Sequence, residues 1–275
     1  MTRSSIIIAE STISSHRTPI HIFIVLELIN SPLAMSQLAD RSTKTLETYG
    51  WTSVPHDTSV LLKDISPWDP AIYDVTDIQV PHTELAEKVQ KYAKERLPDE
   101  VYQHSMRVYF YGVAIAQKHL PSFLPSLETY YLTCLLHDIG TTHENLHGTL
   151  LSFEFYGGYI ALDILKEYGA PKEQAESVAE AIIRHQDLGD VGTISTVGQL
   201  IQLSTLFDNA GKNPTLIAKQ TIESVVAAYP RKQWSSCFAH TIGEEMALKP
   251  WAHSSAIPKF SETVAGNKLM EPWDC

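Results

Sequence analysis

Apolar residues recur at helical spacing along most of the chain from residue 82 onward. In the segment 82–97, Leu85, Val89, Tyr92 and Ala93 fall on one face, as expected for an amphipathic helix. The same spacing predicts further helices over residues 99–120, 126–138, 152–168, 171–185, 195–209 and 215–229, each bounded by Pro, Gly or a capping residue. No run of alternating β-branched residues indicates a substantial sheet. The pattern therefore predicts an all-α fold.

The remaining parts of the chain lack this regular spacing. Residues 35–80 carry scattered Trp and Pro and are expected to be rich in loops, whereas residues 231–275 are rich in Trp, Pro and His. We expect the latter to form an irregular C-terminal cover over the helical bundle. Residues 1–47 are interpreted as a disordered or extraneous extension, and residues 48–275 as the main domain.

Within the extension, residues 20–29 are apolar but shorter than the roughly 20 residues of a membrane span. Arg17 before them and small residues after them give a loose similarity to a signal peptide. Glu27 and His21 inside the apolar stretch weaken that interpretation, and Met35 opens a polar stretch typical of a cytosolic N-terminus. We therefore expect no membrane segment.

Composition narrows the functional classes. The 275 residues carry a formal net charge of −11, which argues against nucleic acid or an anionic membrane surface as a partner. The hydrophobic content of 44% supports a sizeable core. Three widely spaced cysteines, an odd number, fit reduced thiols better than a disulfide framework. We therefore predict a cytoplasmic location.

The pair His137-Asp138 ends the apolar run Tyr130–Leu136 and is the first candidate for chemistry. Burying a carboxylate beside an imidazole is costly unless a cation or a hydrogen-bond partner compensates. His104 and Asp208 fall on the inward faces of two other predicted helices. Helix bundles build metal sites from such facing side chains. Each residue alone also has an ordinary structural explanation, so the combination carries the interpretation.

The order His, His-Asp, Asp resembles the HD-domain metalloenzyme superfamily. Longer segments resemble its fungal cyanamide hydratase branch: HSMRVYFYG, LTCLLHDIGT, SFEFYGG, AEAIIRHQDLG, GQLIQLSTLFDN and KPWAHSSAIPKF. Together with Gly50-Trp51-Thr52-Ser53-Val54-Pro55, the resemblance covers nearly everything after residue 48. The resemblance implies an HD-domain helical bundle that hydrates cyanamide to urea.

The same resemblance implies a site. Zn²⁺ would be held by His104, His137, Asp138 and Asp208, and zinc-bound hydroxide would attack the nitrile carbon. Zinc accepts imidazole and carboxylate ligands at about 2.0–2.2 Å and lowers the pKa of bound water to roughly 7. Such donors also suit Fe²⁺ or Mn²⁺. His185 would orient or protonate the substrate. Thr205 stands three residues before Asp208 and so lies on nearly the same helix face; its hydroxyl could hydrogen-bond the water or the substrate nitrogen, or its methyl group could simply pack.

Two other functions stay open from the residues. An HD-type phosphohydrolase acting on a nucleotide would need cations around the phosphate, and Arg107, Arg184 and Lys212 lie near the motifs. A non-catalytic metal-binding or sensing module is the third class. The expected partner is a small neutral nitrile, cyanamide, and a homo-oligomer is implied by the resemblance alone.

Overall fold

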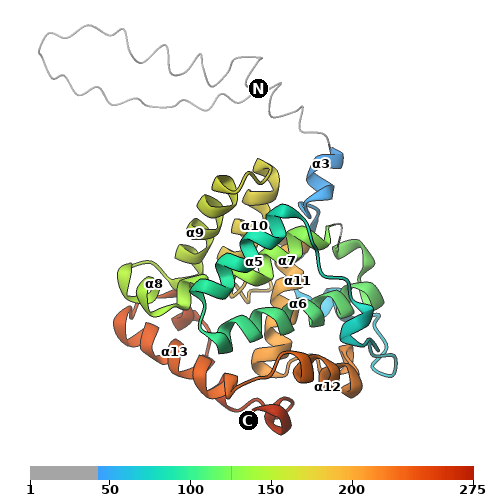
Figure 1. Cartoon of the computed structure of the whole chain (residues 1–275). Helices are drawn as coiled ribbons and strands as arrows, with labels where there is room; N and C mark the ends of the chain where they lie inside the picture. Colours follow the sequence, from blue (N-terminus) through green and yellow to red (C-terminus); the bar gives the residue numbers. More distant parts are fainter. Residues whose placement is uncertain (1–42, 125) are drawn as a thin grey trace, which may run out of the picture. The chain divides into compact units, whose positions relative to one another are not determined.

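The computed structural model describes residues 43–124 and 126–275, and its fold is all-α, as the sequence predicts. The helices that form the bundle are α5 (Glu84–Arg96), α6 (Asp99–His119), α7 (Leu127–Leu136), α9 (Phe153–Glu167), α10 (Lys172–Arg184), α11 (Thr196–Ala210), α12 (Lys219–Ala228) and α13 (Trp234–Leu248) (Figure 1). Short α-helices are α3 (Thr43–Thr48), α4 (Thr58–Leu62), α8 (His143–Gly148) and α14 (Phe260–Ala265). These bounds agree closely with the helices expected between residues 82 and 229.

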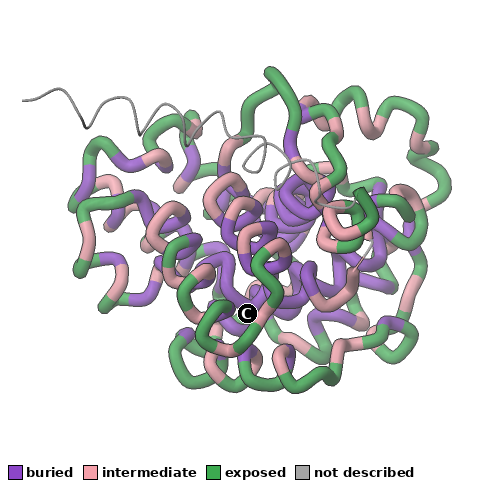
Figure 2. Tube along the Cα trace, turned by 90° about the horizontal axis from the view of Figure 1, so that it is seen from above, coloured by how far each residue is buried: buried purple, intermediate pink, exposed green. Residues whose placement is uncertain are grey.

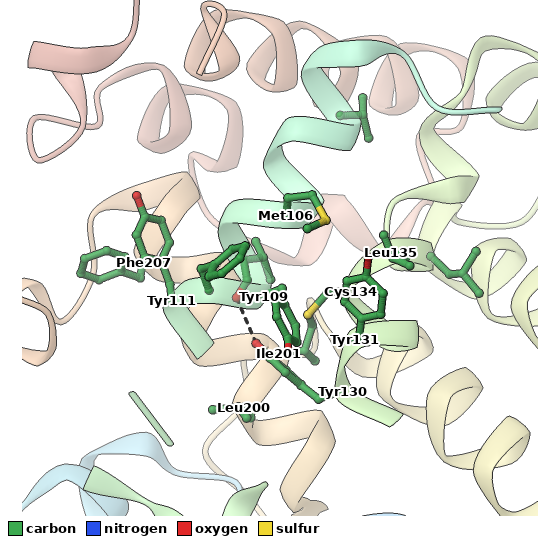
Figure 3. Close-up of a cluster of buried hydrophobic side chains, with 14 of the residues drawn as sticks. Met106, Tyr109, Tyr111, Tyr130, Tyr131, Cys134, Leu135, Leu200, Ile201 and Phe207 are labelled. Atoms are coloured by element: carbon green, nitrogen blue, oxygen red, sulfur yellow. Dashed lines mark hydrogen bonds between the residues drawn. The ribbon is translucent and has the colours of Figure 1, made fainter. Parts of the chain in front are cut away.

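Helix α6 lies at the centre of the described part of the chain. It is buried without a break over residues 104–116, and it packs against α5, α7, α11, α12 and α13. Buried positions gather along such central helices, while the surrounding connections are exposed (Figure 2). The close-up in Figure 3 shows aromatic side chains of α6 and α7, among them Tyr109, Tyr130 and Tyr131, beside Leu200 and Ile201 of α11. A residue on α6 that faces this core is therefore held rigidly.

Helix α7 brings the second element of the site into the core. The Ser126 hydroxyl accepts a hydrogen bond from the backbone N–H of Thr129 and caps the helix. Residues 129–140 are all buried, because the helix is apolar on every side. The helix ends at Leu136 with His137 as its C-cap, so the His137-Asp138 pair leaves the helix inside the protein.

Gly140 serves as a packing residue rather than as the helix stop that its position suggests. A Cβ atom at Gly140 would overlap the backbone carbonyl of Phe153, the first residue of α9. The absence of a side chain lets the start of α9 press against the turn that follows Asp138. This contact fixes the position of the aromatic side chain of Phe153 near the site.

Residues 43–80, expected to be rich in loops, are tied to the bundle by short pieces of backbone pairing. Strand β1 (Ser53–Pro55) pairs antiparallel with β2 (Thr193–Ser195), with Val54 opposite Ile194. A single parallel bridge joins Ala71 to Ile217. These pairings hold the segment between α10 and α11, where β2 lies, close to the start of the described chain.

The prediction of an irregular C-terminal cover is wrong for residues 234–248, which form the helix α13. Its apolar positions, including Trp234, Phe238 and Ile242, are buried. Helical spacing was obscured there because Trp, Ser, Cys and His interrupt the aliphatic pattern. The segment after α13 is made of short helical turns, among them η5 (His253–Ala256), α14 and η6 (Glu271–Trp273).

The interpretation of residues 1–47 as an extension falls mainly on residues 1–42, which lie outside the described residues, as does the weak similarity to a signal peptide. Helix α3 occupies residues 43–48. Among the helices that are described, none combines the length and the apolar character needed to cross a membrane.

Gly140→Ala is expected to lower the free energy of unfolding by about 1–3 kcal/mol, the usual range for overpacking a tight contact. The added methyl group must push α9 away from the His137-Asp138 turn. Guanidinium chloride denaturation measures the change. Gly148→Ala is the control, because no atom lies near its new methyl group. Equal stability of the two variants would contradict the packing role of Gly140.

Candidate metal centre

Three of the four predicted metal ligands come together inside the bundle. The Nε2 atoms of His104 and His137 are 3.2 Å apart. An oxygen of Asp138, Oδ2, lies 3.2 Å from Nε2 of His137 and 3.6 Å from Nε2 of His104. All three side chains are at most 1% exposed. They are the only group with metal-ligand spacing within the described residues.

The N–H groups of both imidazoles point away from this cluster and are used in other hydrogen bonds. Nδ1 of His137 donates to the backbone carbonyl of Cys134 at 2.8 Å. Nδ1 of His104 donates to Oδ2 of Asp208 at 2.6 Å. Neutral imidazole carries one N–H, so each Nε2 faces the cluster as a bare lone pair. Two lone pairs 3.2 Å apart repel each other unless a cation lies between them.

Asp138 completes the set of acceptors. Both of its carboxylate oxygens are buried and lack a hydrogen-bond partner. A buried, unpaired carboxylate is strongly unfavourable in a folded protein. The observed separations of 3.2–3.6 Å match the distance of about 3.3–3.6 Å between two ligands that each lie 2.0–2.2 Å from a tetrahedral zinc ion. The donor set therefore fits a divalent metal ion in both charge and spacing.

The pKa shifts reflect the same excess of negative charge and lone pairs. Burial favours the neutral carboxyl of Asp138, but the neighbouring histidines, His137 foremost, outweigh it and hold the pKa well below its usual range. Burial disfavours the charged form of His137, yet the charge of Asp138 outweighs it and raises the pKa of that imidazole. Burial lowers the pKa of His104 to about 4, so its imidazole is neutral at physiological pH, as a metal ligand must be.

His185 lies beside this cluster, as expected from the sequence. It is the C-cap of α10, and its Nδ1 donates to the backbone carbonyl of Ile182 at 2.7 Å. Its Nε2 lies 3.7 Å from Oδ1 of Asp138, and its ring meets those of His137 and Phe153 edge-on. Burial, reinforced by the charge of His137, lowers the pKa of His185 to about 4. The imidazole therefore faces the site as a neutral proton acceptor.

A pocket of about 160 Å³ opens next to His185. Thr205 and Gln186 line it together with mostly apolar side chains, among them Leu188, Ile257 and Phe260. The Thr205 hydroxyl donates to the Ile201 carbonyl at 2.9 Å, so its oxygen is left as an acceptor. The C-terminal segment thus supplies one wall of the pocket, in agreement with the cover expected from the sequence.

Gln186 is a residue of this pocket that the sequence did not single out. The residue is 95% buried, and its side-chain oxygen has no hydrogen-bond partner. It follows His185 directly in the chain. An orphaned amide oxygen next to a pocket can accept a hydrogen bond from a bound molecule.

Asp208, the fourth predicted ligand, is not brought into the donor cluster. Its carboxylate lies on the Nδ1 side of the His104 ring, away from Nε2. It accepts hydrogen bonds from Arg107, with Nη2 at 2.9 Å, and from Nη1 of Arg231 at 2.6 Å. Both guanidinium groups outweigh its burial and hold the pKa of the carboxyl far below its usual range. Asp208 therefore lies behind His104, on the side of the ring away from the three converging donors.

The contacts of α13 with the site were missed from the sequence. The indole of Trp234 stacks on the His104 ring, with centroids 4.2 Å apart, and donates to the Asn209 side chain at 2.7 Å. Arg231, just before α13, reaches Asp208. Neither residue stands in a pattern that distinguishes it from other Trp or Arg residues, and only the fold brings them to His104.

Comparison with known proteins places the chain in a family. A model of the HD domain matches residues 101–219. Two curated relatives from Saccharomyces cerevisiae, the cyanamide hydratases DDI2 and DDI3, are each 37% identical over 224 residues, which cover 81% of this chain and 98% of the relative. The chain belongs to the cyanamide hydratase family of HD-domain proteins. The resemblance found in the sequence motifs is thereby confirmed.

The HD-domain match covers most residues of the site but not all of them. His104, His137, Asp138, His185, Thr205 and Asp208 all lie inside residues 101–219. Arg231 and Trp234, which contact Asp208 and His104, lie beyond that match. The metal identity, the oligomeric state and the cytoplasmic location stay predictions.

His137→Ala is expected to abolish stoichiometric metal binding, because it removes one of three converging donors and leaves an empty space beside the Asp138 carboxylate. Elemental analysis of purified protein should give about one divalent ion per wild-type chain and far less for the variant. His147→Ala is the control, since this exposed histidine lies on α8. Retention of a full equivalent by His137→Ala would remove the cluster as the binding site.

Proposed function

We propose that the protein hydrates cyanamide to urea at a zinc ion held by His104, His137 and Asp138. The observation that carries the proposal is a buried cluster made only of acceptors, two imidazole lone pairs and a carboxylate without a hydrogen-bond donor. The relatives that carry the name cyanamide hydratase indicate which reaction such a centre performs. Two imidazoles and one carboxylate are a ligand set typical of catalytic zinc with an open coordination position.

When bound, zinc would lower the pKa of a coordinated water toward 7 and so supply a hydroxide nucleophile for the nitrile carbon. Hydration adds water across the carbon–nitrogen triple bond, so one oxygen joins carbon and a proton must reach the nitrile nitrogen. The product, an isourea, becomes urea by moving a second proton from oxygen to nitrogen. The protein must therefore supply a group that can take up and return a proton.

We assign this proton transfer to His185. Its Nδ1–H is held by the Ile182 carbonyl, and its Nε2 is free to accept a proton beside the cluster. Because its pKa is lowered to about 4, the imidazole starts neutral and cannot act as the initial acid. It would accept the proton released by the attacking water and then donate it to the nitrile nitrogen.

Asp208 is proposed to orient His104 instead of binding the metal. Carboxylates that accept the distal N–H of a metal-ligating imidazole fix its tautomer and raise its basicity. The contact of 2.6 Å between Asp208 and Nδ1 of His104 is of this kind. Trp234 holds the same ring in place by stacking.

The substrate is proposed to lie in the pocket beside His185. Its volume of about 160 Å³ suits a small molecule, since one water occupies about 30 Å³ of liquid. The buried oxygen of Gln186 would accept a hydrogen bond from the amino group of cyanamide. Thr205 lines the same pocket, and its hydroxyl oxygen would accept a hydrogen bond from water or substrate.

The structure disfavours the alternative of a nucleotide phosphohydrolase. All three nitrogen atoms of Arg107 are engaged, with Asp208 and with the carbonyls of Tyr229 and Pro230, and the side chain is fully buried. Arg184 pairs with Asp187 at 3.0 Å. Lys212, exposed at the pocket, is the one of the three cations that could meet a phosphate.

The purified protein is expected to release urea from cyanamide, and His185→Gln is expected to lower kcat by about 10²–10⁴-fold, the usual contribution of a general acid–base. Metal content should be unchanged in this variant. His240→Gln is the matched control, because His240 is exposed on α13. Urea formation followed by a coupled ammonia assay gives the rates.

Two results would overturn the assignment of cyanamide hydratase activity. Phosphate release from nucleoside monophosphates without urea formation would establish a phosphohydrolase. Stoichiometric metal with turnover in neither assay would establish a binding or sensing module. Full activity in His185→Gln would leave the hydratase in place but remove His185 from the proton transfer.

Gln186→Leu is expected to lower kcat/KM for cyanamide by about 5–150-fold, mainly through KM. Leu has a similar size but removes the acceptor, and a lost hydrogen bond to a buried polar group costs about 1–3 kcal/mol. Steady-state kinetics separates KM from kcat. A variant with an unaltered KM would show that the Gln186 oxygen does not contact the substrate.

A further inference from the structure

The Asp208 carboxylate, which lies behind the His104 ligand, is shared by two cations. Arg107 reaches it with Nε and Nη2, and Arg231 reaches it with Nη1. Arg107 and Arg231 are at most 1% exposed. One carboxylate therefore stands between two buried positive charges, and these three groups together carry a net charge of +1.

A second carboxylate, Asp274, restores the balance. Its Oδ1 accepts from Nε of Arg231 at 2.9 Å, so Arg231 bridges Asp208 and Asp274. Asp274 also accepts from the backbone N–H of Ser235, in the first turn of α13. Its side chain is 15% exposed. With Asp274 included, two guanidinium groups and two carboxylates form a group with no net charge, and its Asp208 carboxylate contacts His104.

We propose that Asp274 is a positioning residue for the metal centre, acting through Arg231 and Asp208 on the ligand His104. The inference rests on the proposed metal site. It assigns a role to a residue 55 positions beyond the end of the HD-domain match, which closes at residue 219. It also explains why Arg231, a fully buried cation, is tolerated beside a site that must hold another cation.

The physical argument is one of charge and hydrogen-bond competition. Without Asp274, Arg231 has Asp208 as its sole carboxylate partner and draws more strongly on Oδ1 of that carboxylate, which lowers the negative charge left on Oδ2, the oxygen that His104 uses. Nδ1 of His104 then has a weaker acceptor, so its Nε2 becomes a poorer ligand. The uncompensated positive charge also repels a divalent ion in a medium of low dielectric constant. Both effects lower metal affinity.

Other groups near this network are already paired and do not substitute for Asp274. Asn267 donates from its side chain to the backbone carbonyl of Asp208 at 2.9 Å, and it carries no charge. Glu271, three residues before Asp274, pairs with Lys268 on the surface. Among the described residues, Asp208 and Asp274 are the carboxylates that contact Arg231.

The test measures zinc affinity of the metal-free protein by competition with a chromophoric chelator. Asp274→Asn keeps the shape but removes the charge, and it is expected to weaken zinc binding by about tenfold, the lower end of the range for residues behind metal ligands. Asp274→Glu should recover most of the loss. Glu271→Gln, a charge-removing change in the same segment, is the control and should bind zinc like the wild type.

The double variant Arg231→Gln with Asp274→Asn gives a second, independent readout. It returns the group to neutrality with Arg107 and Asp208 alone, so its zinc affinity should exceed that of Asp274→Asn. Thermal unfolding of the metal-free variants separates a structural role. A lowered midpoint with unchanged zinc affinity in Asp274→Asn would overturn the proposal, as would a double variant that binds still more weakly.

These outcomes differ from failure of the proposed function. A wild-type protein that binds zinc but produces no urea would remove the hydratase assignment and leave this inference standing. A wild-type protein that binds no metal would remove both.

Discussion

The other features of the site depend on the burial of two aspartates on either side of His104. Asp208 and Asp138 are both at most 1% exposed and both lie within reach of His104. Asp208 is saturated by N–H groups from two arginines and one histidine. Asp138 receives none. A carboxylate buried without donors is tolerated only beside a cation, so the protein satisfies one aspartate internally and leaves the other for a metal ion.

The surrounding fold holds the two aspartates and the imidazoles in these different environments. Each donor lies on a buried helix or directly after one, because a metal site requires separations that vary by only a few tenths of an ångström. His104 comes from the buried middle of α6, and the His137-Asp138 pair leaves the end of α7 inside the core. The tight approach of α9 at Gly140 holds that turn in place. Each imidazole is further fixed by the hydrogen bond of its Nδ1–H.

Much of this arrangement could be predicted from the sequence, and the part that could not has a clear physical reason. Helical periodicity located His104 and Asp208 on inward faces, and the apolar run before His137 indicated its burial. An inward face does not say which neighbour a carboxylate meets. Asp208 meets Arg231, which comes from a segment without regular spacing. Periodicity therefore predicts burial, whereas the division of labour between two aspartates depends on contacts between distant segments.

The stacking of Trp234 on His104 and the contacts of Arg231 with Asp208 have a consequence for biosynthesis. A chain is made from its N-terminus, and segments fold as they emerge. His104, His137 and Asp138 leave the ribosome well before residues 231–274, so a nascent chain holds all three donors without the groups that orient one of them. The proposed metal centre is thus completed only after the last helical segment has docked, and metal loading is expected to follow synthesis of the whole chain.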